Sequence, residues 1–371
     1  MTSRERLLTA LQLGKPDRMP ASLHQWQEFH LKTYMNGMSD LEAFAEVGLD
    51  AQIQHVDEGG QHYLALDAFE RCSTPEWRDY AAVEDPDPEH RVIRHTIETP
   101  DGDLTYATES NLKTTWVTEH LIKSDREIDL IEKYMPVTVH DSAPVEALRD
   151  RIGDAGILRG AVWGDQAGCW QHACVLMDIN DLIYRCIDEP EWVHRLLAIL
   201  LEKKLRHIDS MGGTAYDIVE TGGGASSSTV ISPALHEEFC LPYDRKMHDA
   251  LHAAGLKATY HTCGGTFGLE ELIVANGCDA SETFAPKSIG GNQEPWELAE
   301  KLRGRIAMIG GIDQFNVVTD GPPERIREKT FELFEKVGGD GGYICSLSDH
   351  FFDTPVQHLK AFAEAAKECR Y

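Results

Sequence analysis

The sequence predicts a single (β/α)8 barrel, an α/β fold, over all 371 residues. Eight short apolar runs alternate with stretches of helical periodicity along the chain. No Gly-x-Gly-x-x-Gly motif opens an early βαβ unit, which argues against a dinucleotide-binding fold. Eight strands alternating with helices fit a closed parallel barrel better than an open sheet, and barrels of this length form one domain.

The elements follow one another in regular order. Thr2 or Ser3 caps a first helix, which ends at Gly14. Helical periodicity is clearest over residues 191–210 and 323–337. The eight predicted strands are residues 19–23, 51–56, 157–163, 215–220, 257–263, 278–284, 306–312 and 342–347.

One segment departs from this alternation. Between the second and third strands, residues 91–98 and 104–108 flank a turn at 100–103 that contains proline, aspartate and glycine. This pattern is typical of a β-hairpin. We expect the hairpin to be an excursion that covers one mouth of the barrel.

Composition excludes several classes of function. The chain carries 35 Lys and Arg against 62 Asp and Glu, a net charge of −27, which disfavours nucleic-acid binding. The same charge repels polyanionic small molecules unless a local basic pocket overrides it. No apolar run is long enough to predict a signal peptide or a membrane span. With nine cysteines expected to remain thiols or metal ligands, the sequence predicts a cytoplasmic protein.

A histidine and a cysteine end the fifth predicted strand. Residues two apart on a strand point to the same face, so His261 and Cys263 project together. At the carboxyl end of a barrel strand, that face opens into the mouth where barrel enzymes place their chemistry. An imidazole and a thiolate side by side form half of a zinc site. A packed cysteine beside a hydrogen-bonded histidine is the alternative interpretation of this pair alone.

Two further donors strengthen the zinc hypothesis. Glu282 lies near the end of the sixth predicted strand, and Cys345 lies near the end of the eighth. Donors at the ends of the fifth, sixth and eighth strands can converge at one rim. A weakly held Glu282 would leave the open position that a catalytic zinc requires.

Other polar and aromatic residues lie at predicted strand ends. Glu220 closes the fourth strand and Asp349 follows the eighth, so each is a candidate general acid or base, or else a helix cap. Trp26, Trp163 and His350 are candidates for the substrate pocket, although such aromatic residues also pack in protein cores. A pocket walled by tryptophan favours an aryl methyl ether over a small charged amine.

The spacing of His261-Thr-Cys263-Gly from Cys345 resembles the zinc motif of corrinoid-linked methyltransferases in the uroporphyrinogen decarboxylase superfamily. The N-terminal residues 3–20, residues 307–313 and residues 346–352 also resemble this superfamily. The resemblance implies zinc held by His261, Cys263 and Cys345, with Glu282 at the family's carboxylate position. A decarboxylase fits less well, because residues 23–30 lack the arginine-rich segment that binds substrate carboxylates in that enzyme.

The resemblance implies a zinc-dependent methyltransferase that moves a methyl group between a small methylated substrate and a corrinoid. The Asp-x-His-x-x-Gly signature of a corrinoid-binding domain is absent, so the cobalamin is expected on a separate partner protein. Alternatives are transfer from a methyl-corrinoid to a thiol such as coenzyme M, a metal-free decarboxylase, and a non-enzymatic binding barrel. Assembly as a homodimer stays open.

Overall fold

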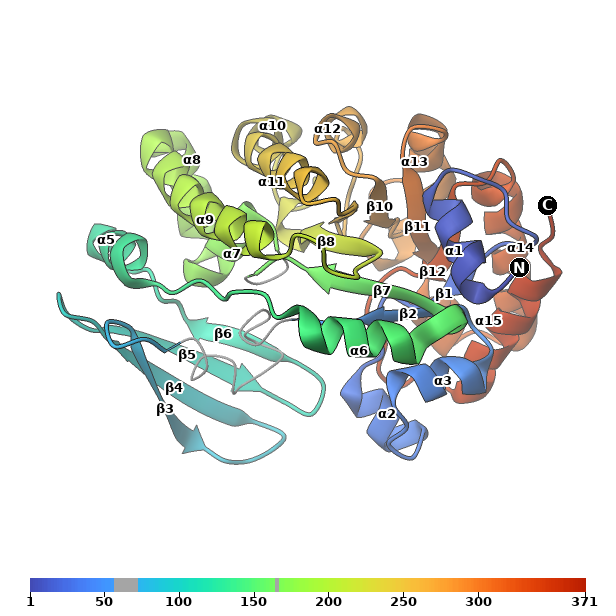
Figure 1. Ribbon diagram of the computed structural model, residues 1–371, viewed down its shortest axis with the longest axis horizontal. Coiled ribbons are helices and arrows are strands. Elements are labelled where there is room, and N and C mark those ends of the chain that lie inside the picture. Colours follow the sequence, from blue (N-terminus) through green and yellow to red (C-terminus); the bar gives the residue numbers. More distant parts are fainter. Residues whose placement is uncertain (57–72, 164–166) are drawn as a thin grey trace.

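The computed structural model describes residues 1–56, 73–163 and 167–371, and its main sheet is a nearly closed barrel of eight parallel strands (Figure 1). Strands β1 and β2 end the order of paired strands, and the Asp50 N–H donates to the Ala21 carbonyl oxygen between them at 2.9 Å. The predicted fold class and all eight predicted barrel strands are confirmed. The strands are β1 (Ala21–Ser22), β2 (Ala51–Gln54), β7 (Gly156–Ala161), β8 (Ile218–Gly222), β9 (Ala258–His261), β10 (Ala280–Thr283), β11 (Ala307–Ile312) and β12 (Tyr343–Leu347).

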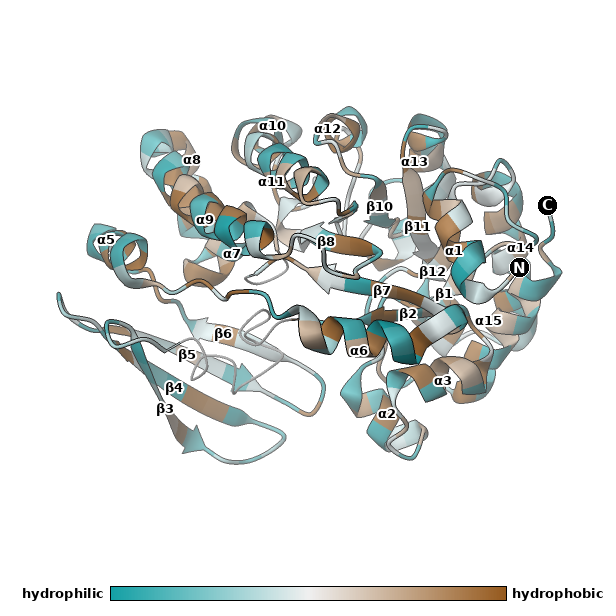
Figure 2. Cartoon of the chain, in the orientation of Figure 1, coloured by the Kyte–Doolittle hydropathy of each residue, from teal (hydrophilic) through white to brown (hydrophobic). Residues whose placement is uncertain are grey.

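Amphipathic helices surround this barrel, and Figure 2 shows hydrophobic and hydrophilic residues interspersed along helices such as α8 and α9. The predicted helix at 191–210 is α9, and the one at 323–337 is α14 followed by the π-helical turn η5 (Phe334–Gly338). The α-helices are α1 (Ser3–Leu11), α2 (Glu28–Tyr34), α3 (Asp40–Val47), α5 (Asp125–Tyr134), α6 (Ser142–Ile152), α7 (Cys169–Leu176), α8 (Ile179–Asp188), α9 (Pro190–Ser210), α10 (Pro233–Phe239), α11 (Leu241–Ala253), α12 (Glu270–Ala275), α13 (Pro295–Leu302), α14 (Pro323–Leu333) and α15 (Val356–Glu368). Short helical turns are η1 (Gly153–Ala155), η2 (Gly224–Ser226), η3 (Lys287–Ile289) and η4 (Gln314–Thr319).

The amino-terminal end of the barrel is filled by apolar side chains. Helix α1 begins with the predicted cap, because the Thr2 hydroxyl accepts from the Glu5 N–H and the Glu5 carboxylate accepts from the Thr2 N–H. Its buried residues pack against one inward-facing layer. The layer consists of Leu7, Ala10 and Leu11 of α1 with Ile157, Ile218, Ala280, Ala307, Ile309 and Ile344 of the strands. These residues show which alternate positions of each strand point into the barrel.

The excursion between β2 and β7 is larger than predicted. The predicted hairpin is confirmed as β4 (Arg91–Glu98) and β5 (Leu104–Ser110). Strands β3 (Arg78–Asp85) and β6 (Thr115–Glu119) extend it to a four-stranded antiparallel sheet in the order β3-β4-β5-β6, which Figure 1 shows beside the barrel. A buried cluster stabilises this sheet, since the Tyr106 hydroxyl donates to Asp79 at 3.1 Å and His95 Nδ1 lies 3.0 Å from the same carboxylate.

In the part of the chain that the structure describes, none of the helices combines the length and the apolar character needed to cross a membrane.

Candidate metal centre at the barrel mouth

A charged layer lies directly above the apolar layer of the barrel. Arg159, Glu220 and Glu282 each stand two residues after an inward-facing apolar residue, so their side chains also point inward. The Arg159 guanidinium is fully buried and donates to Glu282 Oε1 at 2.7 Å and to Glu220 Oε2 at 3.1 Å. This ion-pair network forms the floor of the site.

The two carboxylates of this floor differ in their affinity for a proton. Burial opposes ionisation of both, yet the Arg159 charge and the His261 hydrogen bond hold the pKa of Glu282 far below its ordinary value. Burial and the neighbouring Glu282 charge instead raise the pKa of Glu220. Glu282 is therefore the fixed anion of the layer.

His261 is held by this floor and keeps one ring nitrogen available. Its Nδ1 lies 3.1 Å from Glu282 Oε1, while its Nε2 is buried and has no hydrogen-bond partner among the described residues. A carboxylate that orients a histidine through one ring nitrogen is the usual support of a metal-binding imidazole. Burial disfavours the charged ring, but the neighbouring Cys263 and the Glu282 hydrogen bond raise the pKa of His261 well above its ordinary value.

Three residues with different donor atoms come together at this end of the barrel. The ligand atoms of His261, Cys263 and Asp349 all lie within 4.8 Å of one another. His261 is 1% exposed, whereas the Asp349 side chain is 31% exposed, so the group is anchored in the barrel and reachable from its mouth. Nitrogen, sulfur and oxygen donors from three residues fit zinc and leave a fourth position for a substrate or water.

A glycine leaves room for the thiol of this group. A methyl group on Gly224, in the turn after β8, would lie 2.5 Å from Cys263 Sγ. The glycine run at residues 222–224 therefore shapes the site as well as the turn.

A second group of potential ligands lies deeper in the barrel. His24, Glu220, His261 and Glu282 also bring their ligand atoms within 4.8 Å of one another, and His24 Nδ1 lies 3.6 Å from Glu282 Oε1. The Arg159 guanidinium already forms ion pairs with both carboxylates there. A divalent cation would meet this buried positive charge, so the upper group is the better metal site.

The structure does not bring Cys345 to the predicted zinc site, and this expectation is corrected. On β12, Ile344 belongs to the inward-facing layer, so Cys345 points outward between the barrel and its helices. There it is fully buried, and this burial raises the pKa of its thiol to about 12. Its ionisable neighbours are Tyr343 and Cys369. The third potential ligand beside His261 and Cys263 is instead Asp349, which was predicted as a catalytic residue.

The remaining predicted residues are placed as follows. Glu220 lies in the buried floor, and Glu282 contacts His261 without joining the group of Cys263 and Asp349. Trp26 and Trp163 were predicted in the substrate pocket, but within the described residues both pack in the core: they are 6% and 5% exposed. Their rings contact Phe44 and His172, respectively, because large aromatic residues at strand ends also fill gaps beneath helices.

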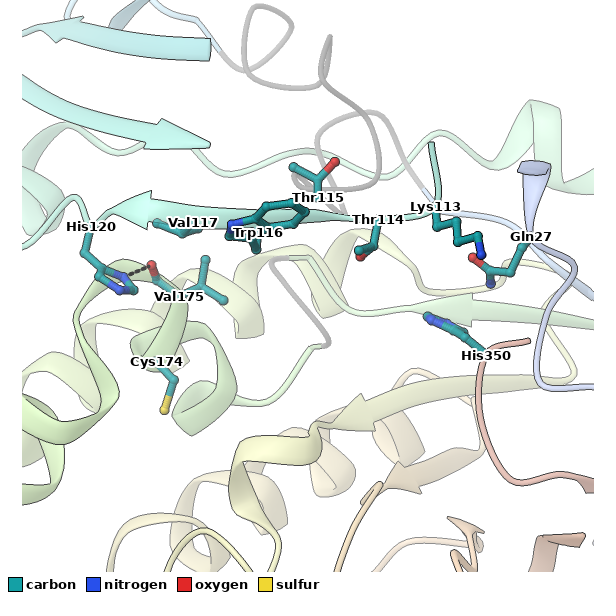
Figure 3. A pocket seen from close by; sticks show the side chains of 10 residues that line it. All are labelled: Gln27, Lys113, Thr114, Thr115, Trp116, Val117, His120, Cys174, Val175 and His350. Carbon is teal, nitrogen blue, oxygen red and sulfur yellow. Dashed lines mark hydrogen bonds between the residues drawn. The ribbon is translucent and has the colours of Figure 1, made fainter. Parts of the chain in front are cut away.

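His350 does reach a pocket of about 350 Å³ at the mouth. Its ligand atom groups with those of His24 and Asp349, so the pocket adjoins the candidate metal centre. Figure 3 shows residues of β6 on one wall, with His350 and the end of α7 opposite. The lining residues are Gln27, Lys113, Thr114, Thr115, Trp116, Val117, His120, Cys174, Val175 and His350. The excursion contributes β6 and the residues beside it to this pocket, whereas no residue of the predicted hairpin strands β4 and β5 is among the described lining residues.

The fold and this site define a (β/α)8-barrel protein with a cluster of potential metal ligands at the carboxyl ends of its strands. The chain belongs to the uroporphyrinogen decarboxylase (URO-D) family, whose model matches residues 112–369.

Relatives of the chain carry two different activities. It is 26% identical over 189 residues to a uroporphyrinogen decarboxylase of Hydrogenovibrio crunogenus, which covers 49% of this chain and 49% of the relative. It is 24% identical over 180 residues to a methylated-thiol–coenzyme M methyltransferase of Methanosarcina mazei, which covers 48% and 46%. The chain thus matches about half the length of these curated relatives.

A solved methyltransferase structure from Methanosarcina mazei has the same fold. It superposes with a TM-score of 0.68 over 99% of both chains at 17% sequence identity.

Proposed function

We propose that this protein is a zinc-dependent methyltransferase that moves a methyl group between a small methylated substrate and a corrinoid on a separate partner protein. The observation that carries the proposal is the group of His261, Cys263 and Asp349 at an open barrel mouth. The relatives named methylated-thiol–coenzyme M methyltransferase and methylcobamide:CoM methyltransferase support it.

The donor set fits zinc for three reasons. The buried Nε2 of His261 lacks a hydrogen-bond partner among the described residues, so binding a cation would satisfy it. Cysteine and histidine are ligands that zinc prefers, and a carboxylate completes many such sites. Zinc, when bound, supplies a Lewis acid that keeps a thiol ionised or polarises an oxygen at a breaking bond.

The protein's own residues prepare this centre. Glu282, held by Arg159, fixes the orientation and tautomer of the His261 ring. Asp349 and His350 follow β12 at the mouth, where both side chains are about one-third exposed or less, and His350 lines the pocket. Reactants can therefore approach the centre from the pocket, while the floor beneath it stays dry.

Transfer from a methyl-corrinoid to a thiol is the close variant of this function, and relatives named for coenzyme M favour it. The two directions are separated by the absorbance of free cobalamin. Supplying cob(I)alamin with a methylated donor would form methylcobalamin in the first, whereas methylcobalamin with a thiol would be consumed in the second.

A metal-free decarboxylase is the second candidate, because the family and the relative from Hydrogenovibrio crunogenus carry that name. Its substrate bears many carboxylates. The one guanidinium in the floor, Arg159, is fully buried and neutralised by Glu220 and Glu282. A substrate anion would gain little from it.

The deciding experiment measures zinc in the purified protein by elemental mass spectrometry. We expect about one zinc per chain in the parent, and loss of zinc from the Cys263→Ala and Asp349→Ala variants with the fold retained. Cys345→Ser is the matched control, since this cysteine is buried in the hydrophobic core and we expect its replacement to leave the zinc content unchanged. A zinc-free parent after reconstitution under reducing conditions would refute the proposed mechanism, and loss of zinc from Cys345→Ser would refute the proposed ligand set.

A further inference from the structure

The pocket at the mouth has a composition unlike that of the whole chain. The described residues that line it include one lysine and two histidines and no acidic residue, although 62 of the 371 residues in the chain are acidic. A lining of this kind tolerates a negatively charged ligand where the rest of the surface repels one.

Two donors lie together at one end of this pocket. Figure 3 shows the Lys113 ammonium beside the Gln27 amide, above His350. Gln27 is only 6% exposed, and its Nε2 has no hydrogen-bond partner among the described residues. A buried amide donor without a partner costs free energy unless a ligand or water accepts from it. The Gln27 amide therefore points to an acceptor that belongs in the pocket.

Lys113 keeps donors available for the same acceptor. Its ammonium pairs with Asp353 and lies 5.1 Å from the centre of the Phe29 ring, which fixes its position. An ammonium has three N–H donors, and the structure shows Asp353 using one of them. A ligand carboxylate can thus accept from Lys113 and from Gln27 together.

The neighbouring wall of the pocket is apolar and aromatic. Trp116 of β6 is 38% exposed and lines the pocket beside Val117. An indole face exposed in a pocket stacks on planar groups, and valine adds apolar contact area. A volume of about 350 Å³ lies at the lower end of the range for small-molecule sites.

We propose that this pocket binds a small planar apolar carboxylate, with the carboxylate on Lys113 and Gln27 and the planar body on Trp116. Its role as the substrate's site rests on the proposed function, because His350 joins the pocket to the candidate metal centre. The methylated substrate is then an aromatic acid.

The test is calorimetric binding to the full-length zinc-loaded protein without any corrinoid. The three probes are para-methoxybenzoate, para-methoxybenzyl alcohol and para-methoxybenzylamine, which share size and shape and differ in charge. We expect the acid to bind at least about tenfold more tightly than the alcohol, which is the effect of a charge-assisted hydrogen bond, and the amine to bind most weakly. Equal affinity for the three probes, or no binding of the acid, would overturn the proposal.

Variants assign the effect to the named residues. Lys113→Gln should abolish the preference for the acid, and Lys113→Arg should restore it. Trp116→Ala should weaken acid and alcohol by the same factor. Lys32→Gln is the control, because Lys32 also pairs with a surface carboxylate at 2.6 Å but lies outside the pocket lining. A preference for the acid that survives in Lys113→Gln would refute the assignment.

The binding assay separates this proposal from the proposed function. Acid binding without methyl transfer to cob(I)alamin would leave the pocket assigned and refute the methyltransferase. Methyl transfer from neutral donors with no acid binding would do the reverse.

Discussion

Replacing Gly224 with alanine should weaken the metal centre without unfolding the protein. The added Cβ would lie 2.5 Å from Cys263 Sγ, and non-bonded carbon contacts require about 3.5 Å, so the thiol must move by about 1 Å. Zinc sites tolerate ligand displacements of about 0.2 Å. A cysteine side chain escapes such a contact by rotating about χ1, which spares the surrounding core.

The expected loss of zinc affinity in Gly224→Ala is about 10- to 100-fold, the range observed when residues that support metal ligands are changed. Gly224 is not among the glycines with positive φ, so alanine fits its backbone and the stability change should stay within about 1 kcal/mol. The assay is competition for zinc against a chromophoric chelator, with the thermal midpoint measured in parallel. Gly212→Ala is the control, since its Cβ would meet its nearest neighbour at 3.6 Å. A Gly224→Ala variant that retains both its fold and the parent's zinc affinity would refute this placement of Cys263.

Three further predictions concern the buried charges. Glu282→Gln weakens the hydrogen bond that orients His261 and removes one charge partner of the buried Arg159 guanidinium. Zinc affinity should fall about 10-fold or more in chelator competition, and stability by about 3 kcal/mol in urea unfolding. An unchanged zinc affinity would contradict the orienting role of Glu282. Burial raises the pKa of Asp244 to about 7, so the folded state keeps a proton that the unfolded state releases near pH 4. As the pH rises from about 4 to 7, the free energy of unfolding should therefore fall by about 1.4 kcal/mol per pH unit. Asp244→Asn, which can still accept from Tyr260, should flatten this slope in thermal midpoints taken at pH 5, 6 and 7, and an unchanged slope would assign the proton elsewhere. Asp50→Asn removes a fully buried carboxylate that accepts from two arginines, and should cost about 3 kcal/mol in urea unfolding; a cost below about 1 kcal/mol would show that the arginines re-pair.

The sequence predicted the barrel because each strand carries a short apolar run between helical segments. It missed β3 and β6 in the excursion, since β3 exposes most of its side chains and shows no apolar alternation. Edge strands of a small sheet are defined by their pairing partners, and pairing is a long-range property that local patterns do not contain.

The site was predicted in part for a related reason. His261 and Cys263 were predicted to lie together from their spacing of two along an extended strand. Strand β9 ends at His261, but the ligand atom of Cys263 in the following turn still lies within 4.8 Å of that of His261. Cys345 required a decision about which face of β12 points inward, and a shift of one residue reverses that decision. Asp349 lies beyond the strand, where only the path of the loop brings it back to Cys263. Trp116, a tryptophan that follows the predicted hairpin and is 38% exposed, was the signal that went unused.

The apolar layer that seals one end of the barrel has a kinetic consequence. With Leu7, Ala10 and Leu11 filling the amino-terminal end, the described part of the chain offers the centre only its carboxyl-terminal mouth. Under the proposed function, the methyl donor and the methyl acceptor would share this one entrance. A bulky carrier protein bound there would block the small molecule behind it, so the small molecule would bind first and leave last. Steady-state kinetics should accordingly show an ordered sequence, in which excess partner protein inhibits the turnover that it otherwise completes.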